Sequence, residues 1–406
     1  MRDLAEKFAG ILKKFAPARV ALHAVRADVT LAALIAAQEA GCELLLLREL
    51  VAPEDAFWRT HEITAVFSEQ FNLLHKPRGG YRPKKFAVLL TTSGTTGKPK
   101  VVMHELEKLV GRVRSEQAEN RWLLTYHPAS FAGMQVLLTA FCSRSLVVAF
   151  SGLNAVELVS KAVNSDVTHL SGTPTFWRSL LLAIPQTGAR PHFQQITLGG
   201  ETVDQSTLDA LRDVFPAARI IHIYASTEAG SLFAVKDQRI GFPARWLTDG
   251  VDGCRLRIRD GMLQVQSPRA MKDYSGPTEN RIATEDGWLV TGDLVEVVED
   301  RVLFRGRLDN ILNVGGGKVM PEQVEAKLLA LPFVREARVY GVKNPLAGVV
   351  LAADIVLATP IPESAARQQI FSALAGALEP YKVPRLFRFL EQIPTSVMGK
   401  KVRTDI

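Results

Sequence analysis

Short apolar segments alternate with helical ones up to about Gly241, and this alternation constrains the fold more than any other feature of the sequence. The apolar segments are short enough to be buried strands, and the stretches between them carry apolar residues at helical spacing. Strand–helix alternation of this kind predicts parallel sheets covered by helices. The expected strands are Cys42–Leu47, Phe86–Gly94, Leu146–Phe150, Thr168–Gly172, Gln195–Gly200 and Arg219–Ser226, and the expected helices include Asp28–Gly41, Ala155–Val163 and Gln205–Val214.

The pattern changes twice further along the chain. After about Gly241, short alternating stretches such as RLRIRD and MLQVQS are separated by Asp/Gly turns, which indicates an antiparallel or barrel-like sheet. From Asp309, a Gly-rich loop, two helices and further strands predict a small α+β unit joined at Leu308–Asn310. Because 406 residues exceed the size of one core, we expect two domains. These are a large α/β N-terminal domain (1–308), with parallel sheets, helices and a small β-barrel-like subdomain, and a small α+β C-terminal domain (309–406).

Composition and charge argue against several classes of protein. The first helix carries Asp3 and Glu6, which interrupt any apolar core of a signal peptide, and no apolar stretch is long enough to span a bilayer. The three cysteines are scattered and lack metal-ligand spacing, so we expect no disulfide framework and a cytoplasmic protein. The net charge is +7, but Lys and Arg are dispersed, which argues against a nucleic-acid-binding stripe.

The segment Thr91–Lys100, TTSGTTGKPK, is the sharpest chemical signal. Its two glycines free the backbone to close around an anion, and its five hydroxyls and two lysines supply donors and charge. A Walker loop is excluded because only two residues separate Gly94 from Gly97, and Pro99 stands where Ser or Thr would coordinate magnesium. An ordinary polar turn would not explain so many phosphate-suited side chains. The predicted phosphate contacts are Thr92, Ser93, Gly94, Thr95, Thr96, Gly97 and Lys98.

Six further motifs follow this loop in order. They are LGGE (Leu198–Glu201), YASTE (Tyr224–Glu228), GMLQVQSP with MKDY (Gly261–Tyr274), GWLVTGDL (Gly287–Leu294), RGRLDNILNVGGGKVMPEQVE (Arg305–Glu325) and PTSVMGKK (Pro394–Lys401). Together with the loop they resemble the adenylate-forming superfamily, which includes acyl- and aryl-CoA synthetases, although Ala225 replaces the usual Gly of the second motif. The resemblance implies an enzyme that uses ATP to convert a carboxylic acid to its acyl-AMP and then transfers the acyl group to a thiol.

The resemblance also implies roles in binding ATP and Mg²⁺. Glu228 would coordinate Mg²⁺ beside the triphosphate, because Mg²⁺ prefers hard oxygen ligands; a surface glutamate is the alternative. Asp293 would accept hydrogen bonds from the ribose hydroxyls, unless it is only a turn-forming residue. Arg307 would bind ribose or phosphate, or would form a salt bridge on a strand. The remaining implied contacts are Gly199, Gly200, Glu201, Tyr224, Ala225, Ser226 and Thr227. A catalytic role is implied for Thr227 and Glu228 as well.

Lys400 is the residue that the resemblance implies for the chemical step. Attack of a carboxylate on the α-phosphate builds negative charge, which a mobile ammonium stabilises; a solvated basic tail is the alternative, and Lys401 is assigned to it. Asp309 falls where the family has its hinge, so the small domain would rotate between the two half-reactions. The rotation would bring a tunnel for the pantetheine thiol, made by Gly315, Gly316 and Gly317, which also fit a hairpin turn.

The acid-binding pocket is only weakly specified by the sequence. Phe131 falls where the family has a His or an aromatic residue beside the acyl group, and Gly200 would line the same pocket; a core aromatic is the alternative for Phe131. His127 is interpreted as structural, because a carboxylate nucleophile needs no general base. We expect a small aromatic acid in preference to a fatty acid.

Three functions remain open at this point. The first is an acyl- or aryl-CoA ligase with CoA as co-substrate, and the second is an enzyme that loads an acidic carrier protein, which the basic charge favours. The third, a catalytically silent relative, is disfavoured because Glu228, Asp293, Arg307 and Lys400 are all present. The phosphate loop begins earlier than is usual for the family. A shortened N-terminal region would alter a pocket wall or leave an apolar face for a second subunit, giving a homodimer.

Overall fold

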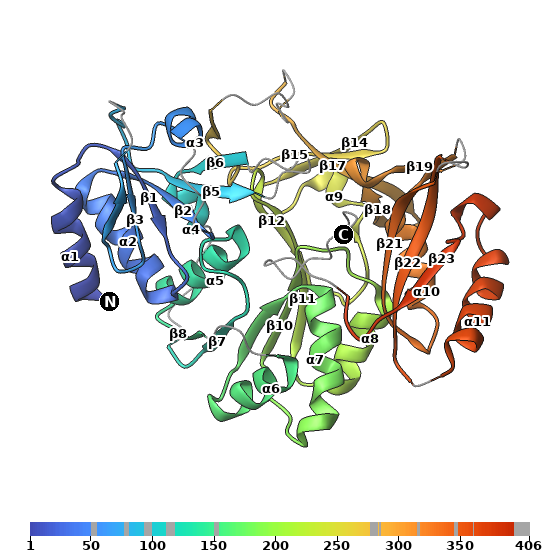
Figure 1. The fold of residues 1–406 in the computed structure, drawn as a ribbon. Helices are drawn as coiled ribbons and strands as arrows, with labels where there is room; N and C mark the ends of the chain where they lie inside the picture. Colours follow the sequence, from blue (N-terminus) through green and yellow to red (C-terminus); the bar gives the residue numbers. More distant parts are fainter. Residues whose placement is uncertain are drawn as a thin grey trace.

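Three sheets and a separate C-terminal unit surround the centre of the molecule in the computed structural model (Figure 1). The structure describes residues 1–49, 55–76, 81–92, 100–110, 118–149, 154–276, 283, 286–314, 317–344, 348–359 and 361–393. Figure 1 shows the N-terminal sheet at the left, the second sheet below, the third above and the C-terminal unit at the right. In the described part of the chain, no helix is both long and apolar enough to cross a membrane.

The first sheet has seven strands in the order β16-β6-β5-β2-β1-β3-β4. Strands β1, β2, β3 and β5 are parallel, as the sequence predicts, whereas β4, β6 and β16 run antiparallel to their neighbours. β6 follows β5 after seven residues, which is too short for the crossover that a parallel strand requires. The elements are β1 (Arg19–His23), β2 (Glu43–Leu47), β3 (Ala65–Phe67), β4 (Leu73–His75), β5 (Val88–Thr92), β6 (Lys100–His104), β16 (Asp273–Ser275), α1 (Arg2–Leu12), α2 (Ala27–Ala40), α3 (Asp55–Thr60) and α4 (Leu106–Val110).

The second sheet has the order β12-β11-β10-β9-β7-β8 and is parallel except for β12. Its helices begin at side-chain caps, such as the capping box of Asn154 and Glu157 on α6. The elements are β7 (Arg121–Leu124), β8 (Leu146–Ala149), β9 (His169–Gly172), β10 (Gln195–Gly199), β11 (Arg219–Ser226), β12 (Gly230–Val235), α5 (Phe131–Cys142), α6 (Ala155–Asn164), α7 (Pro174–Thr187) and α8 (Gln205–Val214).

The predicted antiparallel region is a five-stranded sheet with the order β13-β18-β17-β15-β14. Phe242 of this sheet packs against Phe304 of the same sheet and against Phe233 of β12 in the second sheet. The elements are β13 (Phe242–Pro243), β14 (Arg255–Arg259), β15 (Met262–Gln266), β17 (Leu289–Val298), β18 (Arg301–Arg307) and α9 (Trp246–Asp249).

The C-terminal unit follows the short helix η1 (Leu308–Asn310), at the joint that the sequence predicts. A three-stranded sheet packs one apolar face against two helices, and a two-stranded hairpin lies beside it. The elements are β19 (Leu312–Val314), β20 (Gly317–Val319), α10 (Pro321–Leu329), β21 (Val334–Asn344), β22 (Gly348–Leu357), α11 (Glu363–Ala375), η2 (Pro380–Lys382) and β23 (Leu386–Phe389).

Candidate functional site

The described residues that the sequence assigns to the nucleotide lie on or beside strands of all three sheets, whose β5, β11 and β17 are arranged around the centre of the molecule in Figure 1. β5 ends at Thr92, where the phosphate-loop motif begins, and β11 ends at Ser226, inside the YASTE motif. In parallel sheets, ligands bind at the carboxyl ends of the strands, so both motifs occupy a suitable place. Nine predicted residues lie outside the described part of the chain: Ser93, Gly94, Thr95, Thr96, Gly97, Lys98, Gly315, Gly316 and Lys400.

Tyr224, Asp293 and Arg307 form one polar cluster, although they come from three different strands. The Tyr224 hydroxyl donates a hydrogen bond to Oδ2 of Asp293, and Nη1 of Arg307 lies 3.3 Å from Oδ1 of the same carboxylate. Asp293 on β17 faces Arg307 on β18 directly in the strand register. Burial, and then the adjacent Asp293 charge, raise the pKa of Tyr224 well above its usual value. The Asp293 side chain is therefore held in one orientation by a hydroxyl donor and a cation.

The turn after β11 positions Thr227 and Glu228. The Ser226 hydroxyl accepts a hydrogen bond from the Ala229 amide at 2.9 Å, and the Glu228 carbonyl accepts one from the Met271 amide at 2.8 Å. Burial, and then the nearby Glu228 carboxylate, raise the pKa of Tyr274.

Glu228 fits a magnesium ion that is held mainly by phosphate oxygens. Within the described residues, no group of three or more His, Cys, Asp or Glu side chains is placed to hold a metal ion. Mg²⁺ is commonly bound by one or two carboxylates together with substrate phosphates and water, so a single carboxylate is sufficient there.

Glu201 has a structural partner that the sequence did not predict. Its Oε2 accepts hydrogen bonds from the Thr175 amide at 3.1 Å and from the Thr175 hydroxyl at 2.7 Å, at the start of α7. Gly199 ends β10, and Gly200 has a φ of +83°, a conformation that favours glycine. The LGGE motif therefore turns sharply and ties the second sheet to α7.

Phe131 is the first residue of α5, and hydrogen bonds fix the turn that precedes it. Ser130 caps the helix by accepting from the Gly133 amide at 3.0 Å, and its hydroxyl donates to the His127 carbonyl at 2.7 Å. A Cβ atom on Gly133 would lie 2.1 Å from the His127 carbonyl oxygen, so only glycine fits there. Nδ1 of His127 accepts from the Ala129 amide at 3.1 Å. These contacts agree with the structural role predicted for His127.

His104, which the sequence analysis did not single out, lies against this turn. It ends β6 with no exposed surface, and its ring centroid lies 5.8 Å from that of Phe131. A lone histidine at the end of a strand carries no motif, and only its place a few residues after the phosphate loop could have drawn attention to it.

The predicted hinge and thiol tunnel lie on the side of the C-terminal unit. Oδ2 of Asp309 lies 3.5 Å from Nη2 of Arg307, and Asn310 donates to Glu322 at 2.5 Å. Gly317 pairs with Val314 in the β19–β20 hairpin, and a Cβ on it would meet the Tyr381 ring at 2.3 Å. Figure 1 shows this hairpin well separated from the ends of β5 and β11. In this arrangement the hairpin is therefore separated from the strand ends that lead into the phosphate loop and the YASTE motif.

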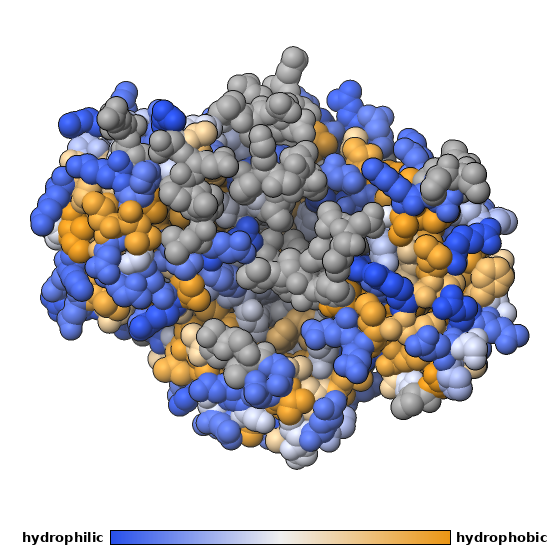
Figure 2. Space-filling model, viewed as in Figure 1, coloured by the Kyte–Doolittle hydropathy of each residue, from blue (hydrophilic) through white to orange (hydrophobic). Residues whose placement is uncertain are grey.

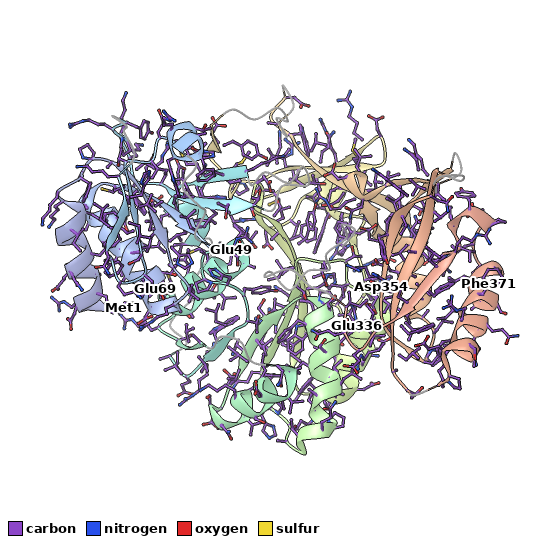
Figure 3. The ribbon with its side chains drawn as sticks, in the orientation of Figure 1. Met1, Glu49, Glu69, Glu336, Asp354 and Phe371 are labelled. Atoms are coloured by element: carbon purple, nitrogen blue, oxygen red, sulfur yellow. The ribbon has the colours of Figure 1, made fainter. Side chains whose placement is uncertain are left out.

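A polar face of the C-terminal sheet is turned toward the second sheet. Oε1 of Glu336, a buried carboxylate on β21, accepts a hydrogen bond from the Ser179 hydroxyl of α7 at 3.3 Å. Asp354 is fully buried and binds both Arg338 and Arg388. Figure 3 shows Glu336 and Asp354 on the side of the sheet that faces α7, with α11 on the other side. The Ser179–Glu336 hydrogen bond thus joins the two parts in the present arrangement.

Comparisons with known proteins agree with the resemblance that the sequence motifs carry. A profile of the AMP-binding enzyme family matches residues 14–268, and a profile of the AMP-binding enzyme C-terminal domain matches residues 323–400. The 4-chlorobenzoate–CoA ligase of Pseudomonas sp. (strain CBS-3) is 28% identical over 361 residues, which cover 80% of this chain and 65% of the relative. A 2-succinylbenzoate–CoA ligase of Bacillus pumilus is 26% identical, covering 78% of this chain and 68% of the relative. The chain thus spans about two thirds of the length of these relatives.

Solved structures share the fold at low sequence identity. An anthranilate CoA ligase, AuaEII, in complex with anthranoyl-AMP has a TM-score of 0.80 at 19% identity, covering 98% of this chain and 89% of that one. ATP-bound MatB from Rhodopseudomonas palustris has a TM-score of 0.77 at 21% identity, covering 98% and 90%. The fold class predicted from the sequence is confirmed by this likeness.

Proposed function

The chain belongs to the AMP-binding enzyme family, and from that premise we propose that it activates a carboxylic acid with ATP and transfers the acyl group to coenzyme A. In the first half-reaction an acid carboxylate attacks the α-phosphate of ATP, giving acyl-AMP and pyrophosphate. In the second, the CoA thiol attacks the acyl carbon, giving the thioester and releasing AMP. The named CoA ligases among the relatives support this choice of acceptor.

The cluster of Tyr224, Asp293 and Arg307 is the observation that carries the proposal. A carboxylate fixed by one neutral donor and one cation points in a constant direction, which suits two adjacent hydroxyls of a ribose. Tyr224 and Asp293 lie 69 residues apart in two different motifs, and the sequence predicts that both residues bind the nucleotide. The proposed ribose contacts are thus Asp293 and Arg307.

The remaining roles are proposed from the motifs. The loop Thr92–Lys98 would bind the triphosphate, Lys400 would stabilise the charge that develops at the α-phosphate, and Gly200 would line the acid pocket beside Phe131. Glu228 would hold Mg²⁺ with the phosphate oxygens, and that ion would neutralise charge on the departing pyrophosphate.

We divide the chain into domains at residue 309 and propose that Asp309 acts as the hinge between them. The β19–β20 hairpin, with Gly317, lies away from the ends of β5 and β11 in the present arrangement. The present arrangement would thus serve acyl-AMP formation, and a rotation at the hinge would be needed before the thiol could reach the acyl-AMP. The buried contact between Ser179 and Glu336 would have to break during this rotation.

The test is ATP–pyrophosphate exchange with a panel of aromatic and aliphatic acids, followed by thioester formation with CoA and with a phosphopantetheine carrier protein. We expect exchange with at least one small aromatic acid and thioester formation with CoA. Transfer to a carrier protein and not to CoA would favour the second candidate, which rests on the net charge of +7. Absence of exchange with every acid would refute the proposed activity.

A homodimer remains a separate proposal. Apolar side chains gather over the N-terminal lobe in Figure 2, and Leu73 and Leu74 on the edge strand β4 are both 48% exposed. Edge strands with exposed apolar residues favour pairing with another chain. Sedimentation that gives a monomer at micromolar concentration would refute the proposal.

A further inference from the structure

Thr175, the second residue of α7, holds the side chain of the LGGE motif with two donors. Its amide and its hydroxyl both donate to Oε2 of Glu201, at 3.1 and 2.7 Å. Thr175 is buried, whereas Glu201 is half-buried and can be reached from solvent. Hydrogen bonds to a carboxylate are among the stronger ones in proteins. The pair therefore fixes where the LGGE turn lies relative to α7.

The Arg178 guanidinium sets the direction of the Thr175 hydroxyl hydrogen. Nη2 of Arg178 donates to this hydroxyl at 3.1 Å, and its Nη1 donates to Oδ2 of Asp204 at 2.9 Å. A guanidinium has donors and no acceptor, so the single hydroxyl hydrogen of Thr175 must point elsewhere. The Glu201 carboxylate is the acceptor that it meets. The first turn of α7 thus determines the orientation of the Glu201 side chain.

The start of α7 is itself fixed on the second sheet. Thr173 caps the helix by accepting from the Phe176 amide at 3.1 Å, and Pro174 occupies the first helical position, which suits proline. The indole Nε1 of Trp177, a residue with no exposed surface, donates to the Thr197 carbonyl of β10 at 3.0 Å. The helix start is therefore joined directly to the strand that leads into the LGGE motif.

The turn that Glu201 follows lies at the carboxyl end of β10. This strand ends at Gly199, and Gly200 has a φ of +83°. Ligands bind at this edge of a parallel sheet, and the motif is one of those assigned to the nucleotide. Glycine restricts the backbone less than any other residue. An anchored side chain next to the two glycines therefore determines which way their backbone faces.

We propose that Thr175 is a positioning residue for the nucleotide and acts through Glu201. Its two donors hold the carboxylate, and the carboxylate holds the Gly199–Gly200 turn in the orientation that binds the AMP moiety. This inference rests on the proposed function and assigns a supporting residue to its ATP site. Because ATP, acyl-AMP and AMP share that moiety, the binding of all three depends on Thr175.

The experiment removes the hydroxyl and then restores it. Thr175→Val keeps the branched shape and the amide donor. We expect the Kd for AMP, measured by calorimetry, and the KM for ATP in pyrophosphate exchange to rise about fivefold, less than the full worth of a hydrogen bond to a charged group because the amide remains. The KM for supplied acyl-AMP in thioester formation rises by the same factor. Thr175→Ser, which keeps the hydroxyl, binds AMP within about twofold of the wild type.

A double-mutant cycle separates positioning from the stability of the helix. In a Glu201→Ala background, Thr175→Val causes no further loss of AMP affinity, because the group through which it acts is gone. Thr30→Val is the matched control: it removes a buried hydroxyl that donates to the Arg26 carbonyl at 2.9 Å in α2, and it leaves AMP affinity unchanged. The melting temperature establishes that each variant is folded.

Three results overturn the inference. The first is wild-type AMP affinity in Thr175→Val, and the second is an equal loss with and without Glu201, which would place the effect in the helix. The third is slower acyl-AMP formation with unchanged thioester formation, which would place it at the contact of Ser179 with Glu336, one turn further along α7.

Failure of the proposed function would look different. The wild type would then bind AMP but activate no acid, and the calorimetric comparison would still decide whether Thr175 positions the turn. A wild type that binds no AMP would refute both the function and the inference.

Discussion

The hydroxyl of Tyr224 provides a one-atom test of the nucleotide site. It donates to Asp293, which Arg307 holds from the other side. Tyr224→Phe removes only this donor, because the ring keeps its contacts with Phe233 and Phe304, whose centroids lie 5.3 and 4.9 Å away. Any loss of nucleotide affinity in Tyr224→Phe therefore reports on the orientation of the Asp293 carboxylate and not on the packing of the ring.

The expected effect follows from the charged acceptor. A hydrogen bond to a charged group is worth about 1.5–3 kcal/mol, and every 1.4 kcal/mol is a tenfold change in affinity. The Asp293 side chain is 16% exposed, so water can replace part of the lost bond, and we take the lower end of this range. Tyr224→Phe should raise the KM for ATP about tenfold in pyrophosphate exchange and weaken AMP binding by calorimetry to a similar degree.

Tyr340→Phe is the matched control. The Tyr340 hydroxyl donates to Asp354 at 3.0 Å, also a buried aspartate, but in the C-terminal sheet. Its removal should leave the KM for ATP within about twofold of the wild type, well below the change that a charged hydrogen bond predicts. If Tyr224→Phe binds ATP and AMP as tightly as the wild type, Asp293 does not bind the nucleotide, and the assignment of this cluster is wrong.

Three further substitutions test the stability of the fold and the contact between the two domains. Asp354→Asn should destabilise the C-terminal unit by about 3–5 kcal/mol, because it leaves Arg338 buried without its counter-charge; an unchanged melting temperature would contradict this. Burial, and then the Arg219 charge, lower the pKa of His169 to about 4 from 6.5, so stability is complete above pH 6.5 and falls as the pH drops toward 4, by up to about 3 kcal/mol. The difference between the denaturation midpoints at pH 7.5 and pH 5 should be smaller in His169→Gln than in the wild type. Equal differences in the two proteins would show that His169 does not cause the loss of stability. Ser179→Ala removes one hydrogen bond to the buried Glu336, so it should shift the domains away from the present arrangement and slow acyl-AMP formation about fivefold. A small-angle scattering profile and a rate identical to those of the wild type would show that this contact does not stabilise the present arrangement.

Local periodicity was sufficient for much of the fold. The residues Gln205–Val214 form α8 with the predicted bounds, and Arg219–Ser226 form β11. Gly41 ends α2 in the left-handed conformation, as expected of a glycine after a helix. These features depend on neighbours within one or two turns, which a sequence pattern records directly.

The contacts that were not foreseen are tertiary. The Glu201–Thr175 bond joins residues 26 apart, and the Ser179 contact with the C-terminal sheet joins residues 157 apart. The burial of the His104 ring against Phe131 also joins separate elements, β6 and α5. Side-chain pairing of this kind depends on how separate elements pack, and neither spacing nor composition carries that information.

Lys400→Ala separates the two proposed half-reactions. We expect acyl-AMP formation, measured by pyrophosphate release, to fall by at least a hundredfold, about the loss expected when one preorganised charge is removed from a transition state. The same variant should convert supplied acyl-AMP to the CoA thioester at the wild-type rate. An equal fall in both half-reactions, or undiminished pyrophosphate release, would contradict the claim that Lys400 acts on the α-phosphate in one domain arrangement and leaves it in the other.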